Sequence, residues 1–159
     1  MSSTAPIDDT TPRRAWLAVL AHATTDELRR LAAPIAEAQR FDWLRPPETG
    51  LVMLRGRIGN TGDRFNLGEA TVTRCVVRVA HPEGGSTAGV GYVLGRDAER
   101  ARWVACLDAL LQAGASHADV MHRVVEPLAA LARQRHRTEQ AAAASSRVQF
   151  YTLQAELNP

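Results

Sequence analysis

The stretch from Arg57 to Arg74 is the densest collection of residues able to bind an anion. Glycines, threonines and carboxylates lie between its arginines. Glycines permit positive φ and leave backbone N–H groups accessible, while arginine forks and threonine hydroxyls donate hydrogen bonds to phosphate, phosphonate or carboxylate oxygens. We therefore predict an anion-binding or partner-binding site here, made of Arg57, Thr61, Arg64, Glu69 and Arg74.

The same residue types also have an ordinary structural use. Gly, Asn, Thr and Asp are frequent in turns, and carboxylates elsewhere in the chain can neutralise the arginines as ion pairs. The carboxylates concerned are Glu48, Asp63, Glu69 and Asp97. Turns and ion pairs are the commoner use of such residues, so both interpretations stay open at this level.

The hydroxyl and imidazole groups do not form a catalytic set. Ser145 and Ser146 lack the G-x-S-x-G surroundings of a hydrolase nucleophile, so we expect them to cap or turn the chain. The closest histidines, His117 and His122, would lie about 140° apart around a helix and cannot readily share a metal ion from one regular helix. We expect no catalytic residue and no metal site on this chain.

Several cofactor chemistries are excluded by residue type. All 19 cationic side chains are arginine, so a Walker A loop, a kinase-type phosphate lysine and a Schiff-base lysine are ruled out. Gly89, Gly91 and Gly95 have the wrong spacing for a dinucleotide loop and lie in a strand-like segment. Cys75 and Cys106 belong to no C-x-x-C motif, which predicts buried free thiols. We expect no cofactor on this chain.

Length and composition indicate one domain. A chain of 159 residues fits a single core, and no apolar run approaches the roughly 20 residues of a membrane span. Residues 1–12 carry no hydrophobic targeting segment, so we expect a flexible N-terminus followed by one domain over residues 13–159, located in the cytoplasm. A net charge of +2 and 5% aromatic residues argue against nucleic acid as a partner.

Hydrophobic spacing places helices at both ends of the chain. Apolar residues recur at helical spacing over residues 13–38, where Thr24 or Thr25 is expected to separate two helices and Pro34 to bend or end the second. Further helices are expected after Asp97 and after Ser116, with Ser116 as the cap of the second one. We place a stop near Gly114, a bend at Pro127 and a polar, alanine-rich helix over residues 133–144.

Alternating patterns in the middle of the chain predict strands. In residues 51–58 the even positions are apolar and Arg55 and Arg57 lie between them, which predicts one buried face and one basic face. Residues 71–79 and 87–94 alternate in the same way around a turn. Helices before and after such a block predict an α+β fold, with an antiparallel sheet of about three to five strands flanked by N-terminal and C-terminal helices.

The segment Arg147 to Leu153 is predicted to form a last β-strand because it is rich in β-forming residues. It either completes the sheet of this domain or lies at an edge where a partner packs against it. The side chains of this candidate interface are Val148, Phe150, Tyr151 and Leu153.

Five segments, in this order and spacing, resemble the PhnG family, which belongs to the carbon–phosphorus lyase system for phosphonates. They are Arg14–His22, Glu48–Leu51, Arg57–Arg74, Val93–Asp97 and Ser146–Phe150. The resemblance spans Arg13 to Leu153 and leaves out the extreme N-terminus and the last few residues.

The resemblance implies a place in a multi-subunit assembly. Family members work with subunits H, I and L to join the ribose-triphosphate part of ATP to an alkylphosphonate such as methylphosphonate, with release of adenine, and they form a complex with subunits H, I and J. The product is ribose 1-methylphosphonate 5-triphosphate, and the chain would be a subunit of the synthase that makes it. The family offers no defined catalytic residue to transfer, so the resemblance implies an accessory subunit. The alternative is a catalytic or substrate-binding subunit acting through Arg57–Arg74.

Overall fold

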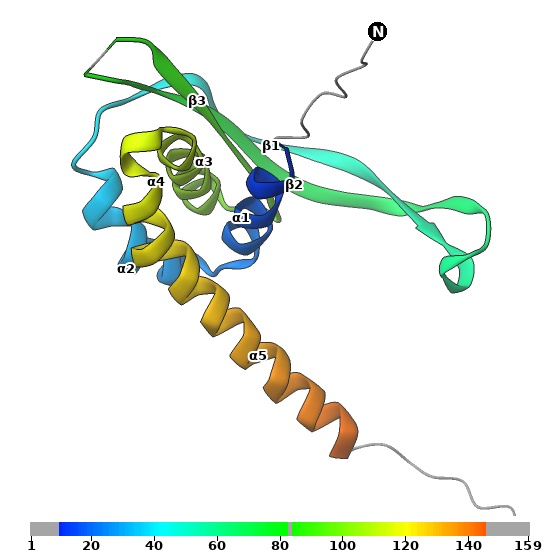
Figure 1. The fold of residues 1–159 in the computed structure, drawn as a ribbon. Helices are drawn as coiled ribbons and strands as arrows, with labels where there is room; N and C mark the ends of the chain where they lie inside the picture. Colours follow the sequence, from blue (N-terminus) through cyan, green and yellow to red (C-terminus); the bar gives the residue numbers. More distant parts are fainter. Residues whose placement is uncertain (1–9, 83, 146–159) are drawn as a thin grey trace, which may run out of the picture.

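The computed structural model describes residues 10–82 and 84–145, which form helices and one antiparallel sheet (Figure 1). The predicted α+β fold is confirmed. The elements in chain order are α1 Thr10–His22, α2 Thr25–Ala36, β1 Phe41–Arg57, β2 Arg64–Ala80, β3 Ser86–Leu94, α3 Ala98–Gln112, α4 Gly114–Val120 and α5 Glu126–Ser145. A 3₁₀ turn, Ile58–Asn60, follows β1, and a π-helical turn, Met121–Val125, joins α4 to α5.

The strands of the sheet differ greatly in length. Their order is β1-β2-β3, and β1 pairs with β2 from Phe41 opposite Val79 to Arg57 opposite Arg64. The nine residues of β3 pair with β2 only as far as Val72, opposite Leu94. Residues 51–71 therefore form a two-stranded ribbon, which we call the arm, and it extends away from the helices (Figure 1).

Helix α3 is the centre of the core. Its residues from Trp103 to Leu111 are all buried, because the sheet lies on one side and other helices surround the rest. The sheet comes unusually close to α3 at two glycines of β3. A Cβ atom at Gly89 would lie 2.0 Å from the Ala105 carbonyl oxygen, and one at Gly91 would lie 1.9 Å from that of Ala101. Only glycine permits this packing distance.

The N-terminal helices follow the predicted pattern with shifted ends. Thr24 caps α2, since its hydroxyl accepts from the Glu27 N–H and the Glu27 carboxylate accepts from the Thr24 N–H. Pro34 lies inside α2, which ends two residues later at Ala36. Helix α1 begins at Thr10, three residues before the expected start of the domain.

The C-terminal helices are joined more closely than the sequence indicates. Ser116 does not cap a helix; its hydroxyl donates to the Leu110 carbonyl at 2.6 Å, and α4 already begins at Gly114. The π-helical turn ends two residues before Pro127, whose ring nitrogen cannot donate to the helical ladder. Helix α5 then leaves the body (Figure 1), held to α2 by an ion pair between Arg135 and Glu27.

The prediction of a buried face on residues 51–58 is wrong. Leu54 is 44% exposed and Ile58 is 72% exposed, and Ile58 belongs to the 3₁₀ turn rather than to a strand. The alternating pattern correctly indicates a strand. However, β3 and the helices do not extend along the arm, so nothing in the described chain covers the apolar face of the arm. The segment Arg147–Leu153 lies outside the described residues. Among the helices of residues 10–82 and 84–145, none combines the length and hydropathy of a membrane span.

Candidate functional site

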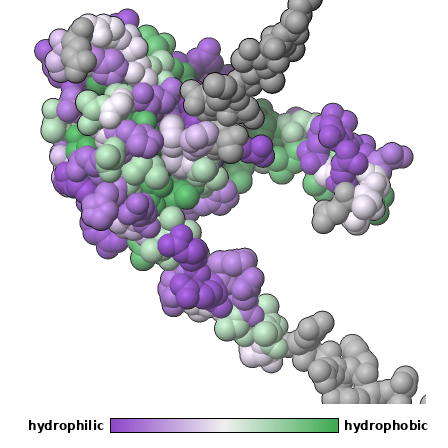
Figure 2. Space-filling model, in the orientation of Figure 1, coloured by the Kyte–Doolittle hydropathy of each residue, from purple (hydrophilic) through white to green (hydrophobic). Residues whose placement is uncertain are grey.

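The arm carries an unusual number of exposed apolar side chains. The described residues include ten large hydrophobic side chains that are exposed, and six of them lie on the arm. They are Leu51, Met53, Leu54, Ile58, Phe65 and Leu67. In Figure 2 the part of the arm next to the body is mainly hydrophobic and its far end is mainly hydrophilic. Contiguous exposed apolar surface of this kind marks an interaction site.

Three of these side chains share one face of the arm. Residues 54 and 56 of β1 point to the same side, and Gly56 is paired with Phe65. The Leu67 side chain lies over Gly56, because a Cβ atom there would be 2.7 Å from Leu67 Cδ1. A register shift beside Leu67 permits this placement. Leu54, Phe65 and Leu67 therefore form a continuous apolar strip, in which the Leu67 side chain lies over Gly56.

The tip of the arm is basic. Arg57 and Arg64 are directly paired across the two strands, and Gly59 in the turn between them has φ 54°, a left-handed value that favours glycine. Arg57 Nη1 donates to the Gly62 carbonyl at 3.3 Å, and Thr61 Oγ1 donates to the Gly59 carbonyl at 3.5 Å. Two like charges held opposite each other repel, so the tip favours an anionic partner.

The structure separates the five predicted site residues. Arg57, Thr61 and Arg64 lie at or beside the tip, and Glu69 lies near the body end of the arm, opposite Met53. Arg74 lies at the body, ten positions from Arg64 along β2, which corresponds to about 30 Å in an extended strand. One anion cannot contact both ends.

Arg74 takes the structural role that the sequence left open. Its Nε donates to Glu48 Oε1 at 2.6 Å, and Arg45 Nη1 donates to the same oxygen at 3.0 Å. The hydrogen bond from Arg74 holds the pKa of Glu48 below its ordinary value. Across the described residues, no ion pair involves Arg55, Arg57 or Arg64.

A buried hydroxyl connects the root of the arm to α3. Thr73 is 1% exposed; its Oγ1 donates to the Gly95 carbonyl at 2.7 Å and accepts from the Asp97 N–H at 3.1 Å. Thr49 Oγ1 lies 3.3 Å from the same atom. Asp97 in turn caps α3 by accepting from the Arg100 N–H at 2.9 Å. This network ties β1, β2 and the turn after β3 together.

The ionised form of Asp97 completes this network. Burial opposes its charge, but hydrogen bonds from the Thr25 hydroxyl and the Arg100 amide outweigh burial and hold the pKa of Asp97 below its ordinary value. Sequence reasoning did not identify Thr49 or Thr73 as part of a site. The available signal was that the segments Glu48–Leu51, Arg57–Arg74 and Val93–Asp97 all carry the family resemblance, and the structure brings them together at the root.

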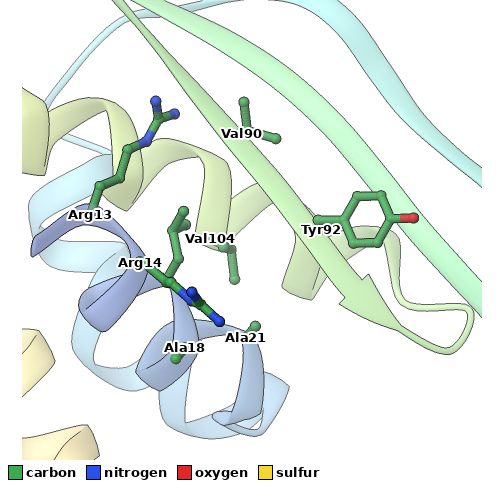
Figure 3. A pocket seen from close by; sticks show the side chains of 8 residues that line it. Arg13, Arg14, Ala18, Ala21, Val90, Tyr92 and Val104 are labelled. Atoms are coloured by element: carbon green, nitrogen blue, oxygen red, sulfur yellow. The ribbon is translucent and has the colours of Figure 1, made fainter. Parts of the chain in front are cut away.

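A shallow concavity of about 520 Å³ lies between α1 and β3. Figure 3 shows residues that line it: Arg13 and Arg14 on α1, Val90 and Tyr92 on β3, and Val104 on α3. The other lining residues are Leu17, Ala18 and Ala21. The lining is mostly aliphatic, and Arg13 is already bonded to a carboxylate of α3. The concavity suits an apolar group better than a triphosphate.

The histidines occupy unrelated positions. His117 Nδ1 lies 2.6 Å from the Leu111 carbonyl and its ring packs edge-on against Trp16 with centroids 5.6 Å apart. His122 pairs with Glu126 on the surface at 3.2 Å. Within residues 10–82 and 84–145, no three His, Cys, Asp or Glu side chains are grouped so that they could hold a metal ion.

Comparison with known proteins identifies relatives over most of the chain. A family described as "Phosphonate metabolism protein PhnG" matches residues 11–155. A protein of Rhizobium meliloti (strain 1021), named alpha-D-ribose 1-methylphosphonate 5-triphosphate synthase subunit PhnG, is 43% identical over 141 residues, which cover 89% of this chain and 87% of that protein.

Proposed function

Because the chain belongs to the PhnG family of phosphonate metabolism proteins, we propose that it serves as a non-catalytic subunit of ribose 1-methylphosphonate 5-triphosphate synthase. The relative that matches most of its length carries the name of a subunit of that enzyme. A non-catalytic subunit contributes to the reaction through its contacts with the other subunits. Its surfaces are therefore more important for its function than any reactive group.

The proposed reaction exchanges the adenine of ATP for a phosphonate. With subunits H, I and L, the assembly would transfer the ribose-triphosphate part of ATP to methylphosphonate or a similar alkylphosphonate and release adenine. Subunits H, I and J would be the physical partners of this chain. Because the reaction consumes ATP, we also propose a cytoplasmic location.

The observation that supports the accessory role is the exposed arm. It presents six large apolar side chains on a ribbon that no other described element covers. The Thr87 hydroxyl does lie beside an imidazole nitrogen, His81 Nε2, but no hydrogen bond between the described residues joins that imidazole to a carboxylate, as a Ser-His-Asp type of catalytic set would need. The chain is therefore better equipped to bind a partner than to perform the chemistry.

A second function is favoured by the tip of the arm. Arg57 and Arg64 lie side by side without a carboxylate partner among the described residues. Guanidinium forks in this arrangement suit a triphosphate or phosphonate. In this alternative the chain contributes directly to substrate binding in the assembled synthase.

Adenine release tests the proposed function. The complete set of subunits is incubated with ATP and methylphosphonate, and adenine is quantified with and without this chain. We expect release to fall to background when the chain is omitted and to return when it is added back. Full release without the chain would overturn the role as a synthase subunit.

A further inference from the structure

We propose that the arm is the docking element of this chain, and that it inserts into an apolar groove bordered by carboxylates on another subunit of the same synthase. This inference rests on the proposed function, since it takes the synthase as the assembly. It adds the surface that binds and the chemistry of the surface that receives it.

The arm lacks a cover of its own. Two-stranded ribbons are marginally stable in water when neither face packs on a core. Beyond Val72 the arm has no third strand, so one edge of each strand lacks backbone partners in the sheet. Its strip of Leu54, Phe65 and Leu67 faces solvent. Covering the strip and pairing an edge both stabilise the arm.

The length of the exposed apolar surface sets the size of the occupant. A triphosphate or phosphonate can contact the arginines of the tip, but it cannot cover apolar side chains that extend from Leu51 to Ile58 on β1 and from Phe65 to Leu67 on β2. Only a macromolecule covers a surface of this length. The occupant is therefore a protein surface, with the tip reaching its far end.

The charges of the arm indicate which groups border the groove. Arg55, Arg57 and Arg64 form no ion pair within the described residues. A groove without carboxylates would therefore bury three guanidinium groups without a partner of opposite charge, which is energetically costly. Asp63 and Glu69 lie among these arginines and would repel the phosphates of a nucleic acid, which disfavours nucleic acid as the occupant. Carboxylates at the border of the groove complement the tip.

The arm is held in place at its root. Thr73 joins the root to the turn after β3 through Gly95 and Asp97, and Glu48 binds Arg74 across the strands. These contacts restrain the direction of the arm at its root. A preorganised arm loses less conformational entropy on binding than a free loop.

Two pairs of substitutions test the proposal in the full-length chain. Leu54→Ser with Leu67→Ser removes the apolar strip, and Arg57→Glu with Arg64→Glu reverses the charge of the tip. Each variant is titrated against separately tagged subunits H, I and J, and its thermal unfolding is recorded. We expect binding to at least one subunit to weaken by at least about tenfold in both variants while the melting temperature stays near that of the wild type. The effect of charge reversal should shrink in high salt.

Matched controls come from outside the arm. Leu44→Ser removes a leucine of β1 that is 52% exposed, comparable with Leu54, but lies outside the arm. Arg30→Glu reverses the charge of an exposed arginine on α2. Both controls should bind like the wild type.

The remaining outcomes overturn the proposal in distinguishable ways. Arm variants that bind all three subunits normally would overturn it, and the proposed function would still stand if adenine release required the chain. Normal assembly with lost adenine release would assign the arm to the substrate instead. Loss of self-association alone, measured by light scattering, would make a second copy of this chain the occupant.

Discussion

Arg13 on α1 and Asp108 on α3 form a two-point ion pair although they are 95 residues apart in sequence. Arg13 Nε lies 3.2 Å from Asp108 Oδ1 and Nη2 lies 2.7 Å from Oδ2. Asp108 is fully buried, and it also accepts from Trp16 Nε1 at 3.0 Å and from the Val90 N–H at 2.9 Å. One carboxylate thus joins α1, α3 and the edge strand β3.

Removing this carboxylate should destabilise the fold strongly. Asp108→Ala leaves the Trp16 and Val90 N–H groups without their acceptor and Arg13 without its partner, so we expect the free energy of unfolding in urea to fall by about 3 kcal/mol. Asp119→Ala is the control, because Asp119 pairs with Arg123 on the surface of the π-helical region and should change stability by less than about 1 kcal/mol. Equal effects of the two substitutions would contradict the buried role of Asp108.

Gly91→Ala should be among the most damaging single changes in the sheet. The added Cβ would lie 1.9 Å from a backbone oxygen of α3, so the helix and β3 must separate. We expect a loss of about 3 kcal/mol or more in urea unfolding. Gly50→Ala on β1 is the control, since no atom lies within 4 Å of the added Cβ, and stability should change by less than about 0.5 kcal/mol.

The two cysteines should be unreactive in the folded protein. Burial raises the pKa of Cys75 to about 11 and that of Cys106 to about 12, and both thiols are free and buried as the sequence predicts. At pH 8 roughly one thiol in a thousand or fewer is ionised. Iodoacetamide should therefore label neither residue in the folded state and both in denaturing urea, as counted by mass spectrometry. Rapid labelling of the folded protein would contradict this expectation.

The same thiols should make stability depend on alkaline pH. Their ordinary pKa is 9.0, so between pH 9 and about 11 the unfolded chain releases protons that the folded chain keeps. Stability contributed by the neutral thiols is complete below pH 9 and falls as the pH rises through this range. Urea unfolding of the wild type and of the Cys75→Ala, Cys106→Ala variant should show a smaller loss in the variant over this interval.

Because the structure separates the predicted site residues, we expect substitutions of Arg57, Arg64 and Arg74 to affect adenine release to different extents. Arg57→Ala and Arg64→Ala should lower adenine release by the assembled synthase without a change in melting temperature, because both side chains are at the exposed tip. Arg74→Ala should have the smaller effect on release, because Arg74 is engaged with Glu48 in a solvent-exposed pair. Arg57→Lys keeps the charge and removes the planar fork, so partial recovery would identify fork geometry as the requirement. Full release by all three alanine variants would contradict a functional role for this region.

Local patterns were sufficient for most helices and strands. The capping box at Thr24 depends on residues three positions apart, and the alternation in residues 71–79 reflects a strand that is covered by helices on one face. The sequence also determined that the chain has no lysine chemistry and that its two thiols are buried, since both follow from residue type and short-range hydrophobicity.

Long-range geometry decided the rest. An apolar strand pattern indicates that a face needs a cover but not whether the cover lies in the same chain. The exposure of Leu54 follows from the end of β3 at Leu94, which leaves the arm without a third strand. The pairing of Asp108 with Arg13 likewise depends on how α1 crosses α3, which no local spacing contains. Sequence determines what each short segment tends to form; only tertiary packing decides which segments meet and which surface remains for a partner.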